Sequence, residues 1–263
     1  MDQLKTFGYE SQELTINAAA ALIQNSKRIT VLTGAGISAE SGIMTFRDHS
    51  TDALWDRFDP AKLSSMNGFK EDPKLVWDWY GDRMGDITAA QPNKAHLALA
   101  KLASHCHVSL FTQNIDDLHE RAGSVVTHFH GDMLGARCFQ EHQSCNWRGL
   151  ANETVSHSHN PGIPGCPKCT SIARPNVVWF GEMLDPLILR KAVQDIGSAD
   201  LIFVIGTSGV VEPVASLVHN NVSPGSTIIS VNKRADDHAW YADKTLTGLA
   251  GDIMSQVVNL VFP

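Results

Sequence analysis

Short apolar runs along the chain alternate with longer stretches in which apolar residues recur every three or four positions. The runs are typical of buried strands, and the longer stretches are typical of amphipathic helices. The apolar runs are residues 29–32, 108–111, 125–129, 176–179, 201–205 and 227–231. The predicted helices are one capped by Ser11 that ends before residue 29, and residues 73–84, 93–103 and 186–196. This order predicts an α/β fold, a parallel sheet with helices on both faces.

Two segments interrupt the alternation. Residues 49–90 begin without a clear period and predict a helical cover over the loop that precedes them. Residues 135–173 have little apolar periodicity and predict a small module that lacks a core of its own. The sheet domain is therefore expected to be discontinuous, with residues 1–48, 91–134 and 174–263.

The composition, with 43% hydrophobic and 19% charged residues, is that of a globular enzyme. A net charge of −7 without a run of Lys or Arg disfavours nucleic acid as a partner. The chain lacks an apolar stretch of the roughly 20 residues that span a bilayer, and its first residues lack a signal-peptide pattern. We therefore expect no membrane partner and a cytoplasmic location.

A glycine-rich loop with Gly34, Gly36 and Gly42 follows the first predicted strand. Glycines let backbone N–H groups approach a pyrophosphate, and Ser38 and Ser41 add hydroxyl donors, although tight strand-to-helix turns use glycine without any ligand. The third glycine comes six residues after the second, which disfavours a hydride-transferring dehydrogenase. Polar residues also follow the later strands, at 112–117, 130–132, 206–209 and 232, where an open α/β sheet binds its ligands.

Four of the five cysteines lie between residues 138 and 169. Cys138 and Cys145 are separated by six residues, Cys166 and Cys169 by two, and four thiolates can close a tetrahedral zinc site. His142 is a possible substitute for Cys145, and a Cys166–Cys169 redox pair or free thiols are the alternatives. A closed site leaves no position for substrate, so the predicted zinc is structural. The fifth cysteine, Cys106, is predicted to be a small buried hydrophobe.

These motifs jointly resemble the sirtuins, which are NAD-dependent protein lysine deacylases with a Rossmann-like sheet. The matching segments run in family order from about residue 28 to 250: 34–38, 45–47, 113–116, 130–131, the four cysteines, 177–182, 206–208 and 231–232. The chain departs from the family pattern at Met44, where proline is common, at Asp48, where a small residue is usual, and in the long spacing from Cys138 to Cys145.

The resemblance implies a catalytic set of His130, Asn114 and Asp116. His130 would be the general base for the ribose hydroxyls of NAD, a role that suits an imidazole that is neutral at pH 7. Asn114 and Asp116 would hold the nicotinamide carboxamide and the ribose. Taken singly, one of twelve histidines at a strand end is more often a surface residue than a catalytic one, and it is the His-Gly context in family order that favours the catalytic role.

NAD would be consumed as co-substrate. The residues that the resemblance implies for NAD binding are Gly34, Ala35, Gly36, Ser38, Phe46, Arg47, Gln113, Asn114, Asp116, Gly206, Thr207, Ser208, Asn232 and Ala250. The acyl-lysine peptide would add as a strand beside Phe180, Gly181, Glu182 and Val211.

Tyr80 and Arg83 form a Tyr-x-x-Arg pair on the predicted helix 73–84. The pair resembles the feature of sirtuins that accept succinyl- and malonyl-lysine, whose terminal carboxylate a guanidinium can bind. The alternative is a solvent-facing pair, with Trp77 and Trp79 on the buried side of the helix.

The predicted activity is NAD-dependent removal of acetyl and succinyl groups from lysine in proteins or peptides, yielding nicotinamide and O-acyl-ADP-ribose. Two alternatives belong to other classes: an NAD glycohydrolase or ADP-ribosyltransferase of the same fold, and a non-catalytic NAD-sensing module. The oligomeric state stays open.

Overall fold

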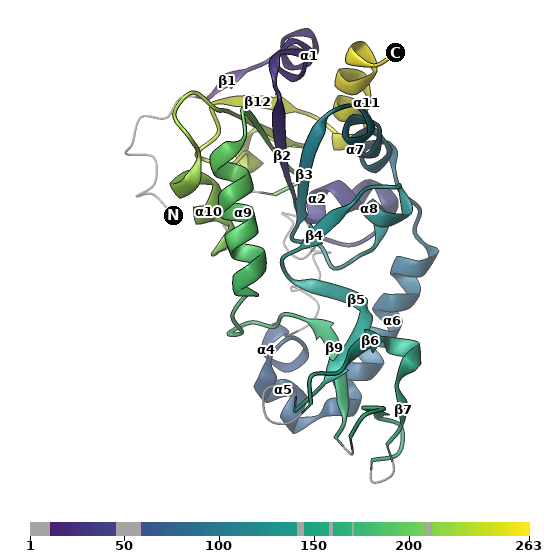
Figure 1. Ribbon diagram of the computed structural model, residues 1–263. Coiled ribbons are helices and arrows are strands. Elements are labelled where there is room, and N and C mark those ends of the chain that lie inside the picture. Colours follow the sequence, from purple (N-terminus) through teal and green to yellow (C-terminus); the bar gives the residue numbers. More distant parts are fainter. Residues whose placement is uncertain are drawn as a thin grey trace.

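In the computed structural model, residues 11–45, 59–140, 145–157, 160–169, 171–207, 209 and 212–263 are described. Their main sheet is seven-stranded, in the order β1-β12-β11-β10-β2-β3-β4, and every pairing is parallel (Figure 1). The strands are β1 (Gln12–Glu13), β2 (Arg28–Thr33), β3 (His107–Thr112), β4 (Val126–His128), β10 (Leu201–Ile205), β11 (Thr227–Asn232) and β12 (Lys244–Thr247). The predicted parallel sheet is confirmed.

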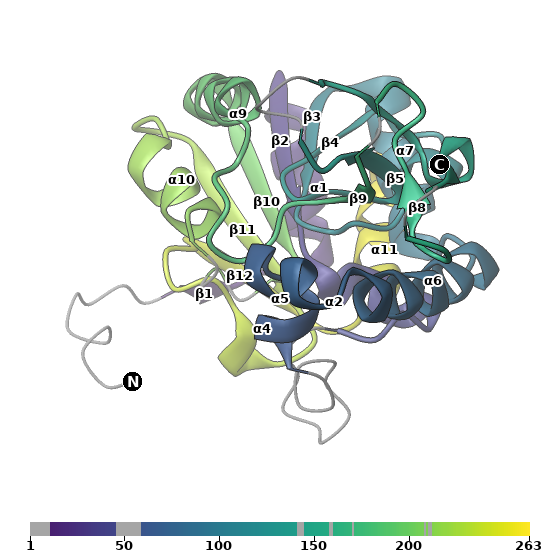
Figure 2. The same ribbon diagram turned by 90° about the horizontal axis from the view of Figure 1, so that it is seen from below.

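Helices cover both faces of this sheet (Figure 2). One face packs against α1 (Ile16–Asn25), α7 (Lys94–His105) and α11 (Ala250–Val261), and the other against α9 (Pro186–Ser198) and α10 (Val214–Asn221). Strand β10 is buried throughout; Phe203 contributes to the first core, and its neighbours Ile202 and Val204 to the second. This alternation, with both faces covered, explains the continuous apolar runs in the sequence.

A second, smaller sheet has the order β6-β5-β9, with β5 (Gly131–Cys138), β6 (Arg148–Leu150) and β9 (Ala173–Val177). Strand β9 pairs antiparallel with β5, so the placing of the apolar run 176–179 among the parallel strands is wrong. A run buried on both faces predicts a strand but does not reveal which sheet receives it. Beside it, β7 (Val155–Ser156) pairs with β8 (Pro164–Gly165).

The helical cover and the cysteine module share one hydrophobic core. The cover consists of α4 (Pro60–Leu63), α5 (Met66–Glu71) and α6 (Pro73–Ala89). Its residues Phe69 and Trp77 belong to the same buried cluster as Cys138 and Ala173 of the module, and the Trp77 indole donates a hydrogen bond to the Ala173 carbonyl at 2.9 Å. The cover and the module therefore pack around one core, and together they make up the small domain.

The predicted helices 93–103 and 73–84 are confirmed and extend further, as α7 and α6. Ser11, however, is not a helix cap: Thr15 caps α1, and residues 12–13 pair as an edge strand with β12. The remaining elements are α2 (Ala35–Ser38), η2 (Ala39–Ser41), α8 (Leu118–Arg121), η3 (Ala151–Glu153) and η4 (Ala235–Asp237). Among the described helices, none has the length and apolar character needed to cross a bilayer.

Candidate active site

The glycine loop leads from β2 into α2 and lies against the loop that follows β10. The Gly36 N–H donates to the Gly206 carbonyl at 2.8 Å, and Gly206 has φ +65°. A Cβ on Gly36 would lie 2.8 Å from the Gly206 Cα, closer than packed carbon atoms come. Close approach of the two loops therefore requires glycine at both positions.

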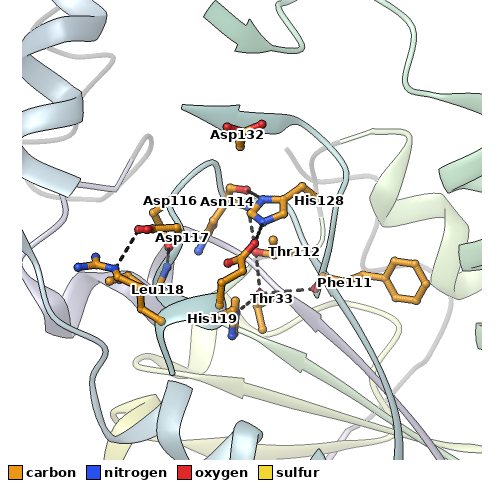
Figure 3. A network of polar contacts seen from close by, with 12 residues as sticks. Thr33, Phe111, Thr112, Asn114, Asp116, Asp117, Leu118, His119, His128 and Asp132 are labelled. Atoms are coloured by element: carbon orange, nitrogen blue, oxygen red, sulfur yellow. Dashed lines mark hydrogen bonds and ion pairs between the residues drawn. The ribbon is translucent and has the colours of Figure 1, made fainter. Parts of the chain in front are cut away.

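Asn114, Ser38 and Asp116 form a buried hydrogen-bonded chain at the ends of β2 and β3. The Asn114 amide donates to the Ser38 hydroxyl at 3.0 Å, and that hydroxyl donates to the Asp116 carboxylate at 2.9 Å. The second carboxylate oxygen accepts from the Leu118 N–H at 3.2 Å (Figure 3). Burial raises the pKa of Asp116, partly offset by the Ser38 hydrogen bond. Ser38 thus links the side chains of Asn114 and Asp116, and its hydroxyl proton is engaged by the Asp116 carboxylate.

These side chains line a pocket of about 460 Å³ between the glycine loop and helix α6. The polar part comes from the glycine loop, the segment after β3 and helix α6, and most of the apolar part comes from residues outside the predicted site, among them Ile43, Ile87, Ile115 and Met133. The lining residues are Ala35, Ser38, Ser41, Gly42, Ile43, Met44, Arg83, Asp86, Ile87, Ala89, Ala90, Asn114, Ile115, Asp116 and Met133. One pocket therefore brings predicted cofactor residues together with Arg83.

His130 lies between β4 and β5 and is not among the residues that line this pocket, but one hydrogen bond holds it in a defined tautomer. Its Nδ1 lies 2.8 Å from the Gln113 carbonyl oxygen, which can only accept, so Nδ1 carries the proton. Burial lowers the pKa of His130, partly offset by that hydrogen bond. Its Nε2 is therefore an unprotonated base near neutral pH.

Several other predicted NAD-binding residues serve mainly to join loops. The Gln113 amide donates to the Thr207 hydroxyl at 3.2 Å. The Asn232 amide donates to the carbonyls of Thr207 and Asp237, at 2.9 and 2.7 Å, so both of its N–H groups are engaged. Ala250 is buried at the start of α11. The Asn232 carbonyl oxygen and the backbone of these loops are what a ligand could contact.

The predicted peptide segment is fixed by a buried ion cluster. The carboxylate of Glu182 receives two hydrogen bonds from Arg174, at 2.6 and 2.7 Å, and one from the Trp179 N–H at 2.8 Å. Burial alone would raise the pKa of Glu182, but these contacts hold that pKa below its usual value. The side chain of Glu182 therefore faces inward, whereas Phe180 and Gly181 are exposed. Arg174, which sequence reasoning missed, is 3% exposed and lies over the Trp179 ring.

Tyr80 and Arg83 point to different surroundings. Tyr80 is buried, and its hydroxyl accepts a hydrogen bond from the Trp179 indole at 3.0 Å, whereas Arg83 lines the pocket. Trp77 and Trp79 are also buried, so α6 has both indoles and Tyr80 in the small-domain core. Of the pair, the structure brings Arg83 to the pocket.

The four cysteines form a compact cluster. Their Sγ atoms all lie within 4.8 Å of one another, with Cys138 and Cys169 at 3.5 Å and Cys145 and Cys166 at 3.7 Å. Four sulfurs at the usual Zn–S distance of about 2.3 Å stand about 3.8 Å apart in a tetrahedron. The cluster therefore fits a zinc ion. Cys106 is half-buried and packs at the edge of the first core.

The sequence model of the Sir2 family matches residues 34–213. The chain belongs to the Sir2 family. It is 46% identical to NAD-dependent protein deacylase 1 of Archaeoglobus fulgidus over 241 residues, which cover 91% of this chain and 95% of the relative. It is 39% identical to the Pseudomonas aeruginosa protein of the same name, over 94% of this chain and 100% of that one.

Solved structures agree with this assignment to the Sir2 family. A Sir2 homologue in complex with NAD superposes with a TM-score of 0.83, 43% identity and 96% coverage of both chains. A Sir2 protein bound to an acetylated peptide superposes with a TM-score of 0.78 and 27% identity, over 94% of this chain and 98% of that one.

Several predicted residues, namely Phe46, Arg47, His142, Ser208 and Val211, lie outside the described residues.

Two histidines of this Sir2-family protein lie buried beneath the site. His119 Nε2 is 3.0 Å from the Thr33 hydroxyl, and the His119 and His96 rings meet edge to face at 4.7 Å (His119 and Thr33 in Figure 3). Burial lowers the pKa of His96 to about 4 and that of His119 to about 3. Both are therefore neutral in the folded protein at pH 7.

We expect this pair to make the protein acid-sensitive. Because both histidines have lowered pKa values in the folded protein, the unfolded chain binds more protons than the folded protein below about pH 6.5. The free energy of unfolding is therefore highest above that pH and falls toward pH 4. Each histidine contributes a slope of up to about 1.4 kcal/mol per pH unit in that window. His128 has the opposite effect on the pH dependence of stability. Burial alone would lower the pKa of His128, but the Glu120 carboxylate, 2.8 Å from its Nε2, raises that pKa.

Urea unfolding between pH 4.5 and 8 measures this slope. His96→Gln and His119→Gln should each lower the slope of unfolding free energy against pH, because each removes close to one proton taken up on unfolding. His128→Gln should make that slope steeper. An unchanged slope in both of the first two variants would show that the acid sensitivity arises elsewhere.

Proposed function

We propose that this chain is an NAD-dependent protein lysine deacylase that transfers acyl groups from lysine to ADP-ribose. The observation that carries the proposal is His130: its Nδ1 is fixed as a donor to the carbonyl of Gln113, the residue before Asn114, which leaves Nε2 as the ring nitrogen that can accept a proton. NAD, when bound, supplies the electrophilic ribose carbon and nicotinamide as leaving group. The chain's own part is to hold the two ends of NAD and to remove a hydroxyl proton at His130 Nε2.

The pocket has the chemistry to receive the carboxamide end of NAD. The buried Asn114 and Asp116 offer acceptor oxygens to an amide N–H₂ group, and the backbone of the Ala35 turn lies opposite them. Apolar side chains such as Ile115 and Met133 exclude water from the same space. A buried polar pair within an apolar wall is suited to orienting a flat, uncharged amide.

An acyl-lysine peptide fits the exposed edge at Phe180 and Gly181. Phe180 already pairs with Ser65 in a short parallel bridge, and its N–H donates to the Ser64 carbonyl at 3.0 Å. Gly181 is exposed with φ +85°, and the inward ion pair of Glu182 holds the segment rigid. Backbone pairing of this kind accepts many sequences around the lysine.

One experiment separates this function from its two alternatives. The protein is incubated with NAD and an acetyl-lysine peptide, and peptide mass and free nicotinamide are followed together. Equal amounts of deacylated peptide and nicotinamide support the deacylase. Nicotinamide release that does not need peptide supports an NAD glycohydrolase or ADP-ribosyltransferase, and no release supports a sensing module.

We further propose that succinyl-lysine is a substrate, because Arg83 places a guanidinium in the pocket. Arg83→Met should lower kcat/KM for a succinyl peptide by about ten- to a hundred-fold, the value of a charge-assisted contact, and affect an acetyl peptide much less. Lys74→Met removes a cation from the exposed start of the same helix and is the matched control, with the succinyl-to-acetyl ratio unchanged. An equal loss on both peptides in Arg83→Met would show that Arg83 does not read the acyl chain.

A further inference from the structure

Arg83 has binding capacity that the protein itself leaves unused. Its Nη2 forms an ion pair with the Asp86 carboxylate at 3.1 Å, one helical turn later. Its Nε and Nη1 are buried and have no hydrogen-bond partner within the described part of the chain. Buried N–H donors without an acceptor are costly, and these belong to a side chain that lines the pocket. The guanidinium is therefore ready for a second, external acceptor.

Asp86 lines the same pocket and places its carboxylate 3.1 Å from Nη2 of the same guanidinium. Among the described lining residues, the ionisable side chains are Arg83, Asp86 and Asp116, one cation against two carboxylates. The pocket therefore lacks the positive balance that a carboxylate-ended acyl chain favours.

We infer that Asp86 is a specificity-determining residue that opposes negatively charged acyl chains and favours acetyl-lysine over succinyl-lysine. The inference rests on the proposed deacylase function and extends it to a residue that Arg83 contacts. An acyl carboxylate bound to Arg83 would lie within a few ångströms of Asp86, so the two like charges repel each other.

Asp86 could also favour a succinyl chain by holding the Arg83 guanidinium in place, but this contribution is small. The Asp86 side chain is 58% exposed, whereas that of Arg83 is 21% exposed, and a half-exposed pair within one helix is weak. Arg83 lines the pocket together with Ile87, the next residue after Asp86. Removing the charge at residue 86 should therefore relieve repulsion more than it loosens the guanidinium.

The test is Asp86→Asn, which keeps the shape and an oxygen that can accept from Arg83 while it removes the charge. We expect the ratio of kcat/KM for succinyl over acetyl peptide to rise about two- to five-fold, the range expected for a charge contact with a half-exposed side chain. Asp82→Asn is the matched control, because Asp82 is exposed on the same helix and does not line the pocket. Its ratio should equal that of the wild type.

Calorimetry gives a second readout that needs no turnover: the Kd for succinyl peptide relative to acetyl peptide should fall in Asp86→Asn, because the repulsion acts on the bound peptide as well. An unchanged or lowered ratio of kcat/KM in Asp86→Asn, with an unfolding midpoint equal to that of the wild type, overturns the inference. If Arg83→Met selectively impairs succinyl peptide while Asp86→Asn has no effect, succinyl removal stands and only the role of Asp86 falls. If Arg83→Met shows no selectivity, the role of Arg83 falls, and a raised ratio in Asp86→Asn still supports Asp86.

Discussion

His130→Ala is expected to lower kcat for an acetyl-lysine peptide by about a hundred- to ten-thousand-fold, the usual contribution of a general base. The reason is the fixed tautomer: the Gln113 carbonyl holds the proton on Nδ1, so Nε2 is the basic nitrogen. Removing the imidazole leaves the Asn114, Ser38 and Asp116 chain in place. NAD should therefore bind with nearly unchanged affinity, as calorimetry would show.

The pH profile gives a second readout of the same group. Because burial lowers the pKa of His130, the acid limb of kcat should lie below pH 6.5, with activity kept at higher pH. His107→Ala, at the exposed start of β3, is the control and should retain turnover. Substantial turnover in His130→Ala at every pH would remove this residue from the proposed mechanism.

The sequence predicted the parallel sheet well because its strands have a strong local signal. Strand β10 is buried on both faces, and such a run of apolar β-branched and aromatic residues can be recognised without knowledge of its neighbours. The capped helices α6 and α7 follow the same logic, since Pro73 and Asn93 mark their starts chemically. The polar segment that follows β3 then predicted Asn114 and Asp116 at the ligand-binding crevice of the sheet.

Contacts between distant segments were not predictable in this way. Strand β9 joins the small sheet because Arg174 and Val177 pair with β5, which its own residues do not reveal. The inward turn of Glu182 depends on Arg174 eight residues earlier, and the burial of Tyr80 depends on Trp179. Asp86 could have been noticed, because residues three apart on a helix are neighbours. Its inferred effect on negatively charged acyl chains, however, depends on the position of Arg83 in the pocket, which the sequence does not reveal.

Removing zinc should unfold the small domain while the parallel sheet stays folded. Structural zinc sites in small peptides contribute about 10–16 kcal/mol, as much as the whole stability of an ordinary domain. Cys138, Cys145 and Cys166 are buried in the same core as Phe69 and Trp77, so loss of the metal would remove the bonds that hold these segments together inside that core. Helix α6, which carries Arg83, should lose its packing together with the module.

Elemental analysis should give one zinc per chain, and Cys166→Ser should lose it, whereas Cys106→Ser, outside the cluster, should retain it. After chelation, limited proteolysis should cut first within residues 145–169 and then within 60–89, because both segments depend on one core. Hydrogen exchange should remain slow in β2, β10 and β11, whose burial does not involve the cysteines. Deacylation should therefore fail in a protein whose sheet is intact, and protease resistance without any bound metal would contradict the zinc assignment.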